Sequence, residues 1–430
     1  MVAFEAPHGQ GRRRVHSHLN LRSSMANPLL DVDSITVRRG MSTVLDNLSI
    51  HLEKGETMAL IGRNGSGKST LLEACASLLP IESGSIRHDK VSVVRPDGAR
   101  SVSPVVVGVT LQKNGSMGSE TVQEHLKSAM SAAGATTDLL PFLEGFNLSH
   151  RRSDAMAQLS QGQARKVAVL AGLLPAFVAS TPALVLLDEP STGLDTNAKA
   201  QLIEWMEQLR SSGHALLIST HDQEVLDACT GAFEIQGASK RHEADSTTPP
   251  NHAKMVSTTP CKKERGGAFG VRHQLRTQAW LTHNGVAGLL TLGLLVVLGD
   301  VNAALSSTQS LGLVLAPAMA IGLSGDAMVN LGREERTHDW RRAVGLSTPH
   351  SSMLPLLLGG IFTAMASQAI VGEAPINHVM LGGLLSVGIA HSMRYLQHSV
   401  DRLARPNAVF VGLLTPVMLL PYALLIDWLG

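Results

Sequence analysis

The sequence has few cysteines, almost no net charge and no apolar segment near its start. The three cysteines (Cys75, Cys229 and Cys261) are far apart and form no C-x-x-C pair, so neither a disulfide framework nor a zinc site is indicated. The net charge is +1, so no overall field would attract nucleic acid, and we predict no nucleic-acid partner. The basic N-terminal stretch is followed by no apolar core and is not a secretory signal.

The amino-acid composition changes along the chain and divides it into unequal parts. Its 430 residues suffice for two or three domains. Residues 1–28 predict a disordered tail, or a translation start that truly lies at Met25. Residues 29–236 have the mixed composition of a soluble domain. Residues 237–270, rich in Ser, Thr, Pro and Lys, predict a linker. Residues 271–430 are dominated by Leu, Gly, Ala, Val and Met and predict a transmembrane domain.

A phosphate-binding loop is the first motif of the soluble part. The segment from Gly62 to Ser69 fits G-x-x-x-x-G-K-[ST] between a strand-like run and the start of a helix. The backbone N–H groups of such a loop surround phosphate oxygens, the lysine reaches the β- and γ-phosphates, and the hydroxyl of Ser69 ligates Mg²⁺. The predicted ATP-binding residues are Gly62, Asn64, Gly65, Ser66, Gly67, Lys68, Ser69 and Thr70.

Two acids end a second buried strand, residues 183–187. An acid at the end of such a strand, near a phosphate loop, suits the coordination shell of Mg²⁺, and we assign this role to Asp188. The next acid, Glu189, is positioned to polarise an attacking water molecule. The cofactors that these motifs predict are therefore ATP and Mg²⁺.

A pentapeptide between the two motifs, Leu159-Ser160-Gln161-Gly162-Gln163, resembles the signature motif of the ATP-binding cassette (ABC) family. The resemblance covers about residues 29–233. It implies an α/β P-loop NTPase cassette with a helical subdomain between Gln112 and Ser160. It also implies that Glu189 is the catalytic base, that Gln112 senses Mg²⁺ and that His221 contacts the γ-phosphate. Asp195 then belongs to the D-loop, and Ser160, Gly162 and Gln163 complete the ATP site of a second cassette.

Two positions depart from the family pattern. Gln161 replaces the usual second-position glycine of the signature, while the neighbouring Gly162 is retained. The family also tends to place an aromatic ring upstream of the phosphate loop to stack on adenine. The matching region, Val37–Gly40, has no aromatic residue, and Arg39 is the candidate to stack its guanidinium plane on the base.

The C-terminal part predicts an all-α transmembrane domain of about five helices, each long enough to cross the bilayer. Their expected ranges are 281–299, 310–329, 353–371, 379–394 and 407–425. The arginine-rich stretches lie between spans two and three and between spans four and five, whereas the other loops have no Lys or Arg. The positive-inside rule places residues 262–276 and both arginine-rich loops in the cytoplasm, which agrees with a cytoplasmic ATPase domain. We therefore expect a multi-pass protein of the cell (plasma) membrane.

The loop from Arg333 to His350 has two open interpretations. It resembles the region of ABC-2-type exporters in which charged residues precede a short helix that docks on the ATPase, and Glu334, Glu335 and Trp340 would make that contact. Alternatively, the loop is solvated and only fixes the topology.

The order of ATPase and membrane half resembles a half-transporter of the ABC-2 exporter superfamily. One signature and one phosphate loop per chain imply a homodimer or heterodimer through the ATP-binding domains. The family's sixth span is not found, so we expect a truncated chain or an additional membrane subunit. Residues 159–168 and 346–350 resemble the cytochrome c maturation (Ccm) haem exporter, which predicts haem as substrate. A non-transport membrane ATPase driving a protein machine, or an exporter of another small molecule or lipid, remains the alternative.

Overall fold

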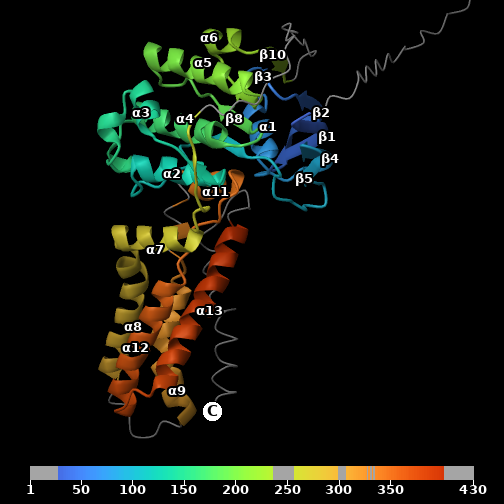
Figure 1. Ribbon diagram of the computed structural model, residues 1–430. Coiled ribbons are helices and arrows are strands. Elements are labelled where there is room, and N and C mark those ends of the chain that lie inside the picture. The colour runs from blue at the N-terminus through green and yellow to red at the C-terminus, as the bar shows by residue number, and fades with distance from the viewer. Residues whose placement is uncertain are drawn as a thin grey trace, which may run out of the picture.

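A computed structural model of the protein describes residues 28–235, 256–298, 307–326, 328–329, 332 and 335–400 (Figure 1). A soluble cassette of mixed strands and helices lies at one end, and a bundle of helices extends away from it. The predicted N-terminal tail, Glu334 and the fifth predicted span (407–425) lie outside the described residues.

The centre of the cassette is a parallel sheet with the strand order β10-β3-β9-β8-β6. Strands β8 and β9 are buried along their whole length and, apart from Asp188 at the end of β8, consist of apolar or small residues, as expected for a parallel sheet covered by helices on both faces. The five strands are β3 (Thr57–Ile61), β6 (Val107–Thr110), β8 (Leu184–Asp188), β9 (Ala215–Ser219) and β10 (Gly231–Glu234).

A smaller antiparallel sheet, with the order β2-β1-β4-β5, stands beside the parallel sheet. Buried and less buried residues alternate along much of strand β1, because one face of this sheet packs on the core while the other is nearer to water. The strands are β1 (Leu30–Arg39), β2 (Ser42–Leu52), β4 (Ser83–His88) and β5 (Val91–Val94).

The cassette helices complete the predicted α/β P-loop fold with its helical subdomain. Helices α2 and α3 lie between β6 and the signature, as predicted, and Thr121 and Glu124 form a capping box that starts α2. The helices are α1 (Lys68–Cys75), α2 (Val122–Ala132), α3 (Leu140–Gly145), α4 (Gln161–Val178), α5 (Thr196–Ser211) and α6 (Gln223–Asp227).

The segment that leads into the membrane half follows the surface of the cassette. Its short strand β11 (Thr259–Pro260) pairs with β7 (Ala135–Thr136) of the helical subdomain. Helix α7 (Gly266–Thr277) then crosses between the cassette and the bundle (Figure 1). Gln278, in the left-handed conformation, ends α7, and a π-helical turn (Trp280–Gly285) leads into α8 (Val286–Leu298).

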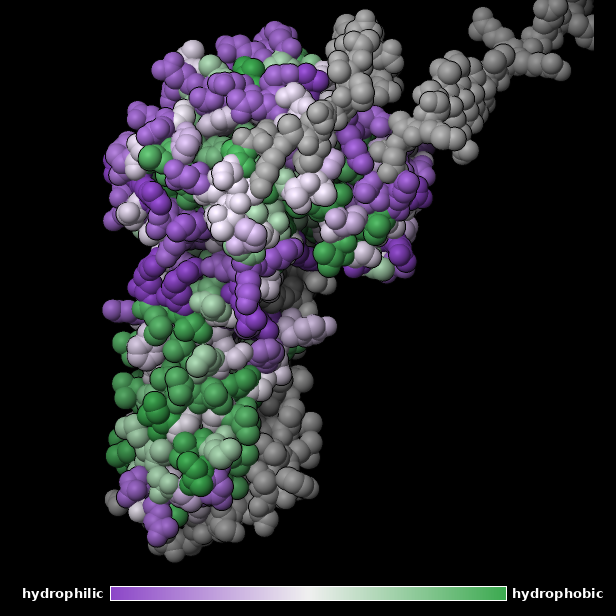
Figure 2. Space-filling model, viewed as in Figure 1, coloured by the Kyte–Doolittle hydropathy of each residue, from purple (hydrophilic) through white to green (hydrophobic). Residues whose placement is uncertain are grey.

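The bundle corrects the prediction of five spans. Within the described residues three helical segments are long and apolar enough to cross a membrane: Trp280–Val297, Met353–Val371 and Ile376–Leu396. They comprise the π-helical turn with α8, helix α12 (Met353–Val371) and most of α13 (Ile376–Val400). Apolar side chains dominate the outer surface of the bundle (Figure 2), where they would face lipid.

The second predicted span, 310–329, is a shorter helix. Helix α9 (Ser307–Leu323) stops because Gly325 adopts a left-handed conformation (φ +76°). The Asp326 carboxylate then accepts hydrogen bonds from Met328 N and from Gln274 of α7, which turns the chain towards the cassette. Apolar composition continues past the turn, which is why the sequence alone overestimated the length of the span.

The loop after α9 docks on the cassette, so the first of its two interpretations agrees with the contacts. Its short helix α11 (Thr337–Ala343) places Trp340 in the cassette core with 2% exposure, and the indole N–H donates to Val109 O at 3.0 Å. The backbone N–H of Asn114 donates to the Glu335 carboxylate at 3.2 Å, and Gly115 N donates to Glu335 O at 2.9 Å.

We expect Gly115→Ala to loosen this docking. Gly115 has φ +74°, and a Cβ there would lie 2.6 Å from Trp340 Cγ. Left-handed strain alone costs roughly 1–3 kcal/mol, so amide hydrogen exchange of residues 337–343 should be about tenfold faster. Gly118→Ala is the matched control, because its Cβ would make only ordinary contact at 3.4 Å with Ala157 Cβ. Equal exchange in the two variants would contradict the contact.

Candidate nucleotide site

The phosphate loop connects β3 to the start of α1, at the carboxyl edge of the parallel sheet. Gly62 (φ +148°) and Gly67 (φ +107°) need the freedom of glycine, and a Cβ on Gly67 would lie 2.7 Å from Leu45 Cδ2. Lys68 is 7% exposed, and its ammonium donates to Gly62 O at 2.7 Å and to Arg63 O at 3.3 Å. The loop therefore closes around its own lysine.

These residues fit a polyphosphate. The Ser66 hydroxyl is buried at 4% exposure and has no hydrogen-bond partner among the described residues, so it is an available donor inside the loop. Lys68 supplies the adjacent positive charge, and the N-terminus of α1 adds its dipole. Ser69 and Thr70 occupy the first turn of the same helix, while Asn64 and Gly65 lie exposed on the rim of the loop.

The acids assigned to Mg²⁺ and to catalysis lie at the same edge of the sheet. Asp188, the last residue of β8, accepts a hydrogen bond from the Ser219 hydroxyl at the end of β9. The backbone N–H of Glu189 donates to Ser219 O at 3.1 Å and to Ser219 Oγ at 3.0 Å. Ser219 therefore fixes both acids.

Glu189 has a strained backbone and an imidazole neighbour. Its φ of +49° is unusual for a residue with a Cβ, and such strain is found where a side chain must be aimed. The Nε2 atom of His221 lies 3.5 Å from the Glu189 carboxylate. Both side chains are partly exposed, so they face a space that water and substrate can enter.

Metal ligation at this edge is compatible with Mg²⁺. The described part of the chain has no group of three or more His, Cys, Asp and Glu side chains that would hold a metal by themselves. Mg²⁺ commonly takes one or two carboxylates and completes its shell with phosphate oxygens and water. Asp188 and the Ser69 hydroxyl suit that role, and Gln112 is exposed two residues beyond the end of β6.

The signature residues lie at the start of α4. Ser160 caps this helix: Gln163 N donates to Ser160 Oγ at 3.2 Å, and Ser160 N donates to Gln163 Oε1 at 3.0 Å. A Cβ on Gly162 would lie 3.2 Å from Gly193 O, so a glycine suits this close approach. Within the described residues no hydrogen bond or ion pair joins Ser160, Gly162 or Gln163 to the phosphate loop.

Asp195 connects the signature helix to the segment after the catalytic acids. Its carboxylate caps α5 through Ala198 N at 2.9 Å and pairs with Lys166 of α4 at 2.5 Å. The hydrogen bond from Lys166, followed by the bond from Ala198 N, lowers the pKa of Asp195, so the carboxylate is ionised at neutral pH.

Arg39 does not extend into solvent as an isolated guanidinium. Its Nε donates to Thr70 Oγ1 at 3.2 Å, and its Nη2 lies 2.5 Å from the carboxylate of Glu73, one turn further along α1. Sequence reasoning missed Glu73, because no local pattern marks an acid on the inner face of this helix.

Arg165 is a second residue that motif reading did not select, although it lies within the quoted signature stretch. It is buried at 8% exposure and donates to Leu111 O at 2.7 Å and to the carbonyls of Asp188 and Glu189. Burial lowers the pKa of its guanidinium, while the Asp188 and Glu189 carboxylates oppose that shift. One side chain therefore holds the segment before Gln112 against the catalytic acids.

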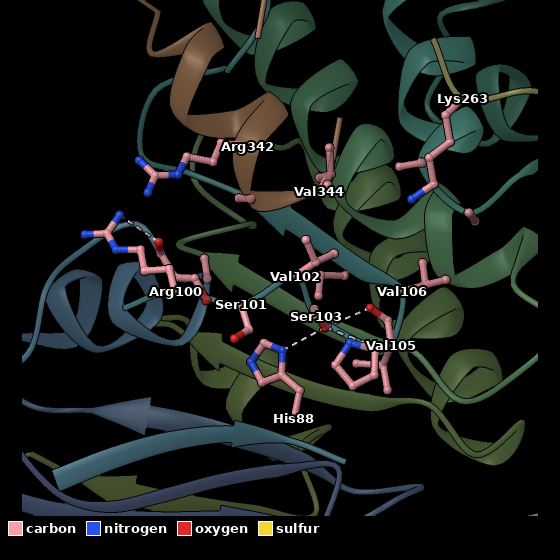
Figure 3. A pocket seen from close by; sticks show the side chains of 18 residues that line it. His88, Arg100, Ser101, Val102, Ser103, Val105, Val106, Lys263, Arg342 and Val344 are labelled. Atoms are coloured by element: carbon pink, nitrogen blue, oxygen red, sulfur yellow. Dashed lines mark hydrogen bonds between the residues drawn. The ribbon is translucent and has the colours of Figure 1, made fainter. Parts of the chain in front are cut away.

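One cavity of the described residues lies away from the phosphate loop. A space of about 440 Å³ separates the residues after β5 from the end of α11, and its basic side chains are Arg100, Lys263 and Arg342 (Figure 3). Burial lowers the pKa of His88 in its lining to about 4, so that imidazole is neutral at pH 7. None of the motif residues lines this cavity, and it has no glycine-rich cradle. We therefore place the nucleotide at the phosphate loop.

We expect Arg165→Ala to destabilise the cassette by roughly 3 kcal/mol, because three buried carbonyls lose a charged donor. The midpoint of thermal unfolding should fall, and ATP hydrolysis should fall with it. Arg210→Ala is the control, because it removes only a surface ion pair with Glu207 and should change stability by less than about 0.5 kcal/mol. Equal unfolding midpoints for the two variants would contradict the bridging role.

Comparison with known proteins agrees with this geometry. The sequence model of the ABC transporter family matches residues 45–192. The zinc import ATP-binding protein ZnuC of Photorhabdus laumondii is 30% identical over 233 residues, which cover 54% of this chain and 81% of that protein. The macrolide export ATP-binding/permease protein MacB of Hyphomonas neptunium is 29% identical over 223 residues, covering 49% and 34%.

A solved dimeric cassette in a post-hydrolysis state with ADP and Pi matches 48% of this chain and 94% of its own length, at 21% identity and a TM-score of 0.41. The chain spans only 35% to 40% of the length of three putative ABC transporter ATP-binding proteins that it also matches. The zinc-import relative, however, is covered over four fifths of its length. With the phosphate loop, the paired acids and the signature helix in one α/β cassette, the chain belongs to the ABC transporter family and carries an ABC ATPase domain.

Proposed function

We propose that the protein is an ATP-driven membrane transporter, a half-transporter whose cassette works in a pair and whose apolar helices cross the plasma membrane. The observation that carries the proposal is the burial of Trp340, from the loop between membrane helices, beside the Asn114–Ser116 segment of the cassette. This segment begins two residues after Gln112, at the edge of the sheet that holds the nucleotide motifs. A conformational change at that edge would therefore be transmitted directly to Trp340 of the membrane half.

The site residues take the following roles in the proposal. Lys68 and the N–H groups of Gly65, Ser66 and Gly67 bind the β- and γ-phosphates of ATP, and Thr70 binds further back along the polyphosphate. Ser69, Asp188 and Gln112 would hold Mg²⁺, which when bound would neutralise charge on the phosphates. Glu189 accepts a proton from water as the water oxygen attacks the γ-phosphorus and ADP leaves. His221, beside Glu189, donates to the γ-phosphate.

The position of the signature supports a dimer. Ser160 is exposed at the N-terminus of the 18-residue helix α4, where the helix dipole favours an anion. Ser160 caps that terminus through Gln163 N, and within the described residues no hydrogen bond joins Ser160 or Gly162 to the phosphate loop of the same chain. A second cassette, facing the first in opposite orientation, would supply the γ-phosphate there. Either a second copy or a related chain would satisfy this geometry.

The direction of transport and the substrate are inferred from the chain's architecture and from short sequence segments. The matched relatives include a protein named for import and one named for export, so similarity in the cassette does not decide direction. The fusion of cassette and membrane helices in one chain, with a docked helix between spans, supports an exporter of the ABC-2 type. Haem is our substrate hypothesis, on the short Ccm-like segments 159–168 and 346–350.

Reconstitution tests the substrate hypothesis. The full chain in lipid vesicles is given Mg-ATP and a panel that includes haem, other small molecules and lipids. Stimulation of ATP hydrolysis by haem, with ATP-dependent movement of haem across the bilayer, would support haem export. Stimulation by another compound assigns that compound instead. Hydrolysis that no panel compound stimulates, but that a protein partner does, would favour the non-transport ATPase.

We expect Glu189→Gln to reduce ATP turnover at least about 100-fold, because the amide cannot accept the proton of the attacking water. ATP binding should persist, and Mg-ATP should trap a closed dimer that size-exclusion chromatography with light scattering detects. Glu204→Gln, on the exposed face of α5, is the control and should hydrolyse ATP like the wild type. Normal hydrolysis by the Glu189 variant would overturn this assignment.

A further inference from the structure

One buried carboxylate joins the nucleotide site to the membrane half. Glu73 lies on α1, five residues after Lys68, and is 5% exposed. One of its oxygens lies 2.5 Å from Arg39 Nη2 at the end of β1, and the other pairs with Arg336 Nη1, immediately before α11. Two cations from distant parts of the chain therefore share a single buried acid.

The Arg39 end of this cluster belongs to the nucleotide site. Arg39 Nε donates to the hydroxyl of Thr70, which follows Ser69 in the first turn of α1. The Arg39 side chain is 45% exposed, so it is accessible to an incoming nucleotide and free to change its contacts. A polyanion bound along the phosphate loop would attract this guanidinium.

The Arg336 end belongs to the docked loop. The Nε atom of Arg336 lies 2.7 Å from the carboxylate of Asp339, which is on α11. Its neighbour Thr337 donates to Ser116 O at 2.9 Å, and Glu335 binds Asn114 and Gly115. A displacement of Arg336 would therefore also displace the segment that positions Trp340.

We propose that Glu73 is a positioning residue that links nucleotide occupancy to the docking of α11. When ATP draws Arg39 away, the carboxylate of Glu73 keeps Arg336 as its ion-pair partner, and that ion pair strengthens because the carboxylate is buried. ATP binding at the phosphate loop and tight docking of α11 therefore favour each other. The link rests on the proposed function, because Arg39 must lie against the bound nucleotide.

Thermodynamic reciprocity gives the sign of the effect. If ATP strengthens the pairing of Arg336 with Glu73, loss of Arg336 must weaken ATP binding. Without Arg336, Glu73 would pair with Arg39 only, and it would compete more strongly with the nucleotide for the Arg39 guanidinium. The effect must vanish when Glu73 carries no charge, since Arg336 does not itself reach the phosphate loop. A purely structural ion pair would show neither property.

A double-mutant cycle on the full chain in detergent tests the link. The dissociation constant for Mg-ATP is measured calorimetrically in the Glu189→Gln background, so that hydrolysis does not interfere. Arg336→Gln should raise this constant about 5- to 10-fold, and Arg336→Lys, which keeps the charge, should raise it less. In combination with Glu73→Gln, the same Arg336→Gln change should alter the constant by less than about twofold.

Two controls separate the link from general damage. Arg342→Gln removes an exposed cation from the same helix, and Arg38→Gln removes the neighbour of Arg39, which pairs with Glu82 on the surface. Both should leave the constant within about twofold of the background. If Glu73→Gln does not fold, Arg39→Gln replaces it in the cycle, because Arg39 is the residue through which Glu73 would act.

The outcomes are distinct. An unchanged constant in Arg336→Gln, or an equal loss with and without Glu73, overturns the link while leaving the ATPase assignment intact. A chain that binds no Mg-ATP in any background overturns the proposed function itself. Weakening by Arg336→Gln that disappears with Glu73→Gln supports the link.

Discussion

The seating of Trp340 in the cassette is the interaction on which the connection between the two halves depends. The indole N–H donates to a carbonyl of β6, and the indole ring packs against the His125 ring in a tilted arrangement with 4.6 Å between the centroids. A buried indole contributes a large apolar area, and its single N–H must find a partner. Because Val109 O is that partner, α11 has a defined position on the edge of the parallel sheet, just before Gln112.

The other contacts between the halves are arranged around this anchor. Arg341, next to Trp340, is fully buried, lies over the ring of Phe269 in α7 at 4.2 Å and pairs with Glu264 at 3.0 Å. Arg276 at the end of α7 pairs with Glu124 of α2 at 2.8 Å and lowers the pKa of Glu124 to about 2. Helices α2, α7 and α11 therefore form one packed junction, in which ionic contacts supplement apolar packing.

Local motifs could be predicted from the sequence, whereas long-range pairs could not. The phosphate loop, the acids after β8 and the signature helix follow from contiguous patterns whose chemistry fixes their local structure, and the cassette fold follows from their order. The pairs of Arg336 with Glu73 and of Trp340 with Val109 join positions 263 and 231 residues apart. Within the described residues the second span was predicted too long, because composition does not reveal a turn such as that at Gly325. Ser219 and Arg165 were not predicted because their partners are distant in sequence: Ser219 donates to the Asp188 carboxylate, and Arg165 donates to the carbonyls of Asp188 and Glu189.

We propose that ATP binding at the cassette changes the conformation of the membrane helices through docked α11. Hydrogen exchange of residues 353–396 with and without Mg-ATP, in the Glu189→Gln background and in the same background with Trp340→Ala, tests it most directly. We predict an ATP-dependent change of exchange in α12 and α13 that is lost with Trp340→Ala, although that variant still binds ATP. An ATP-dependent change of the same size without Trp340 would contradict the account.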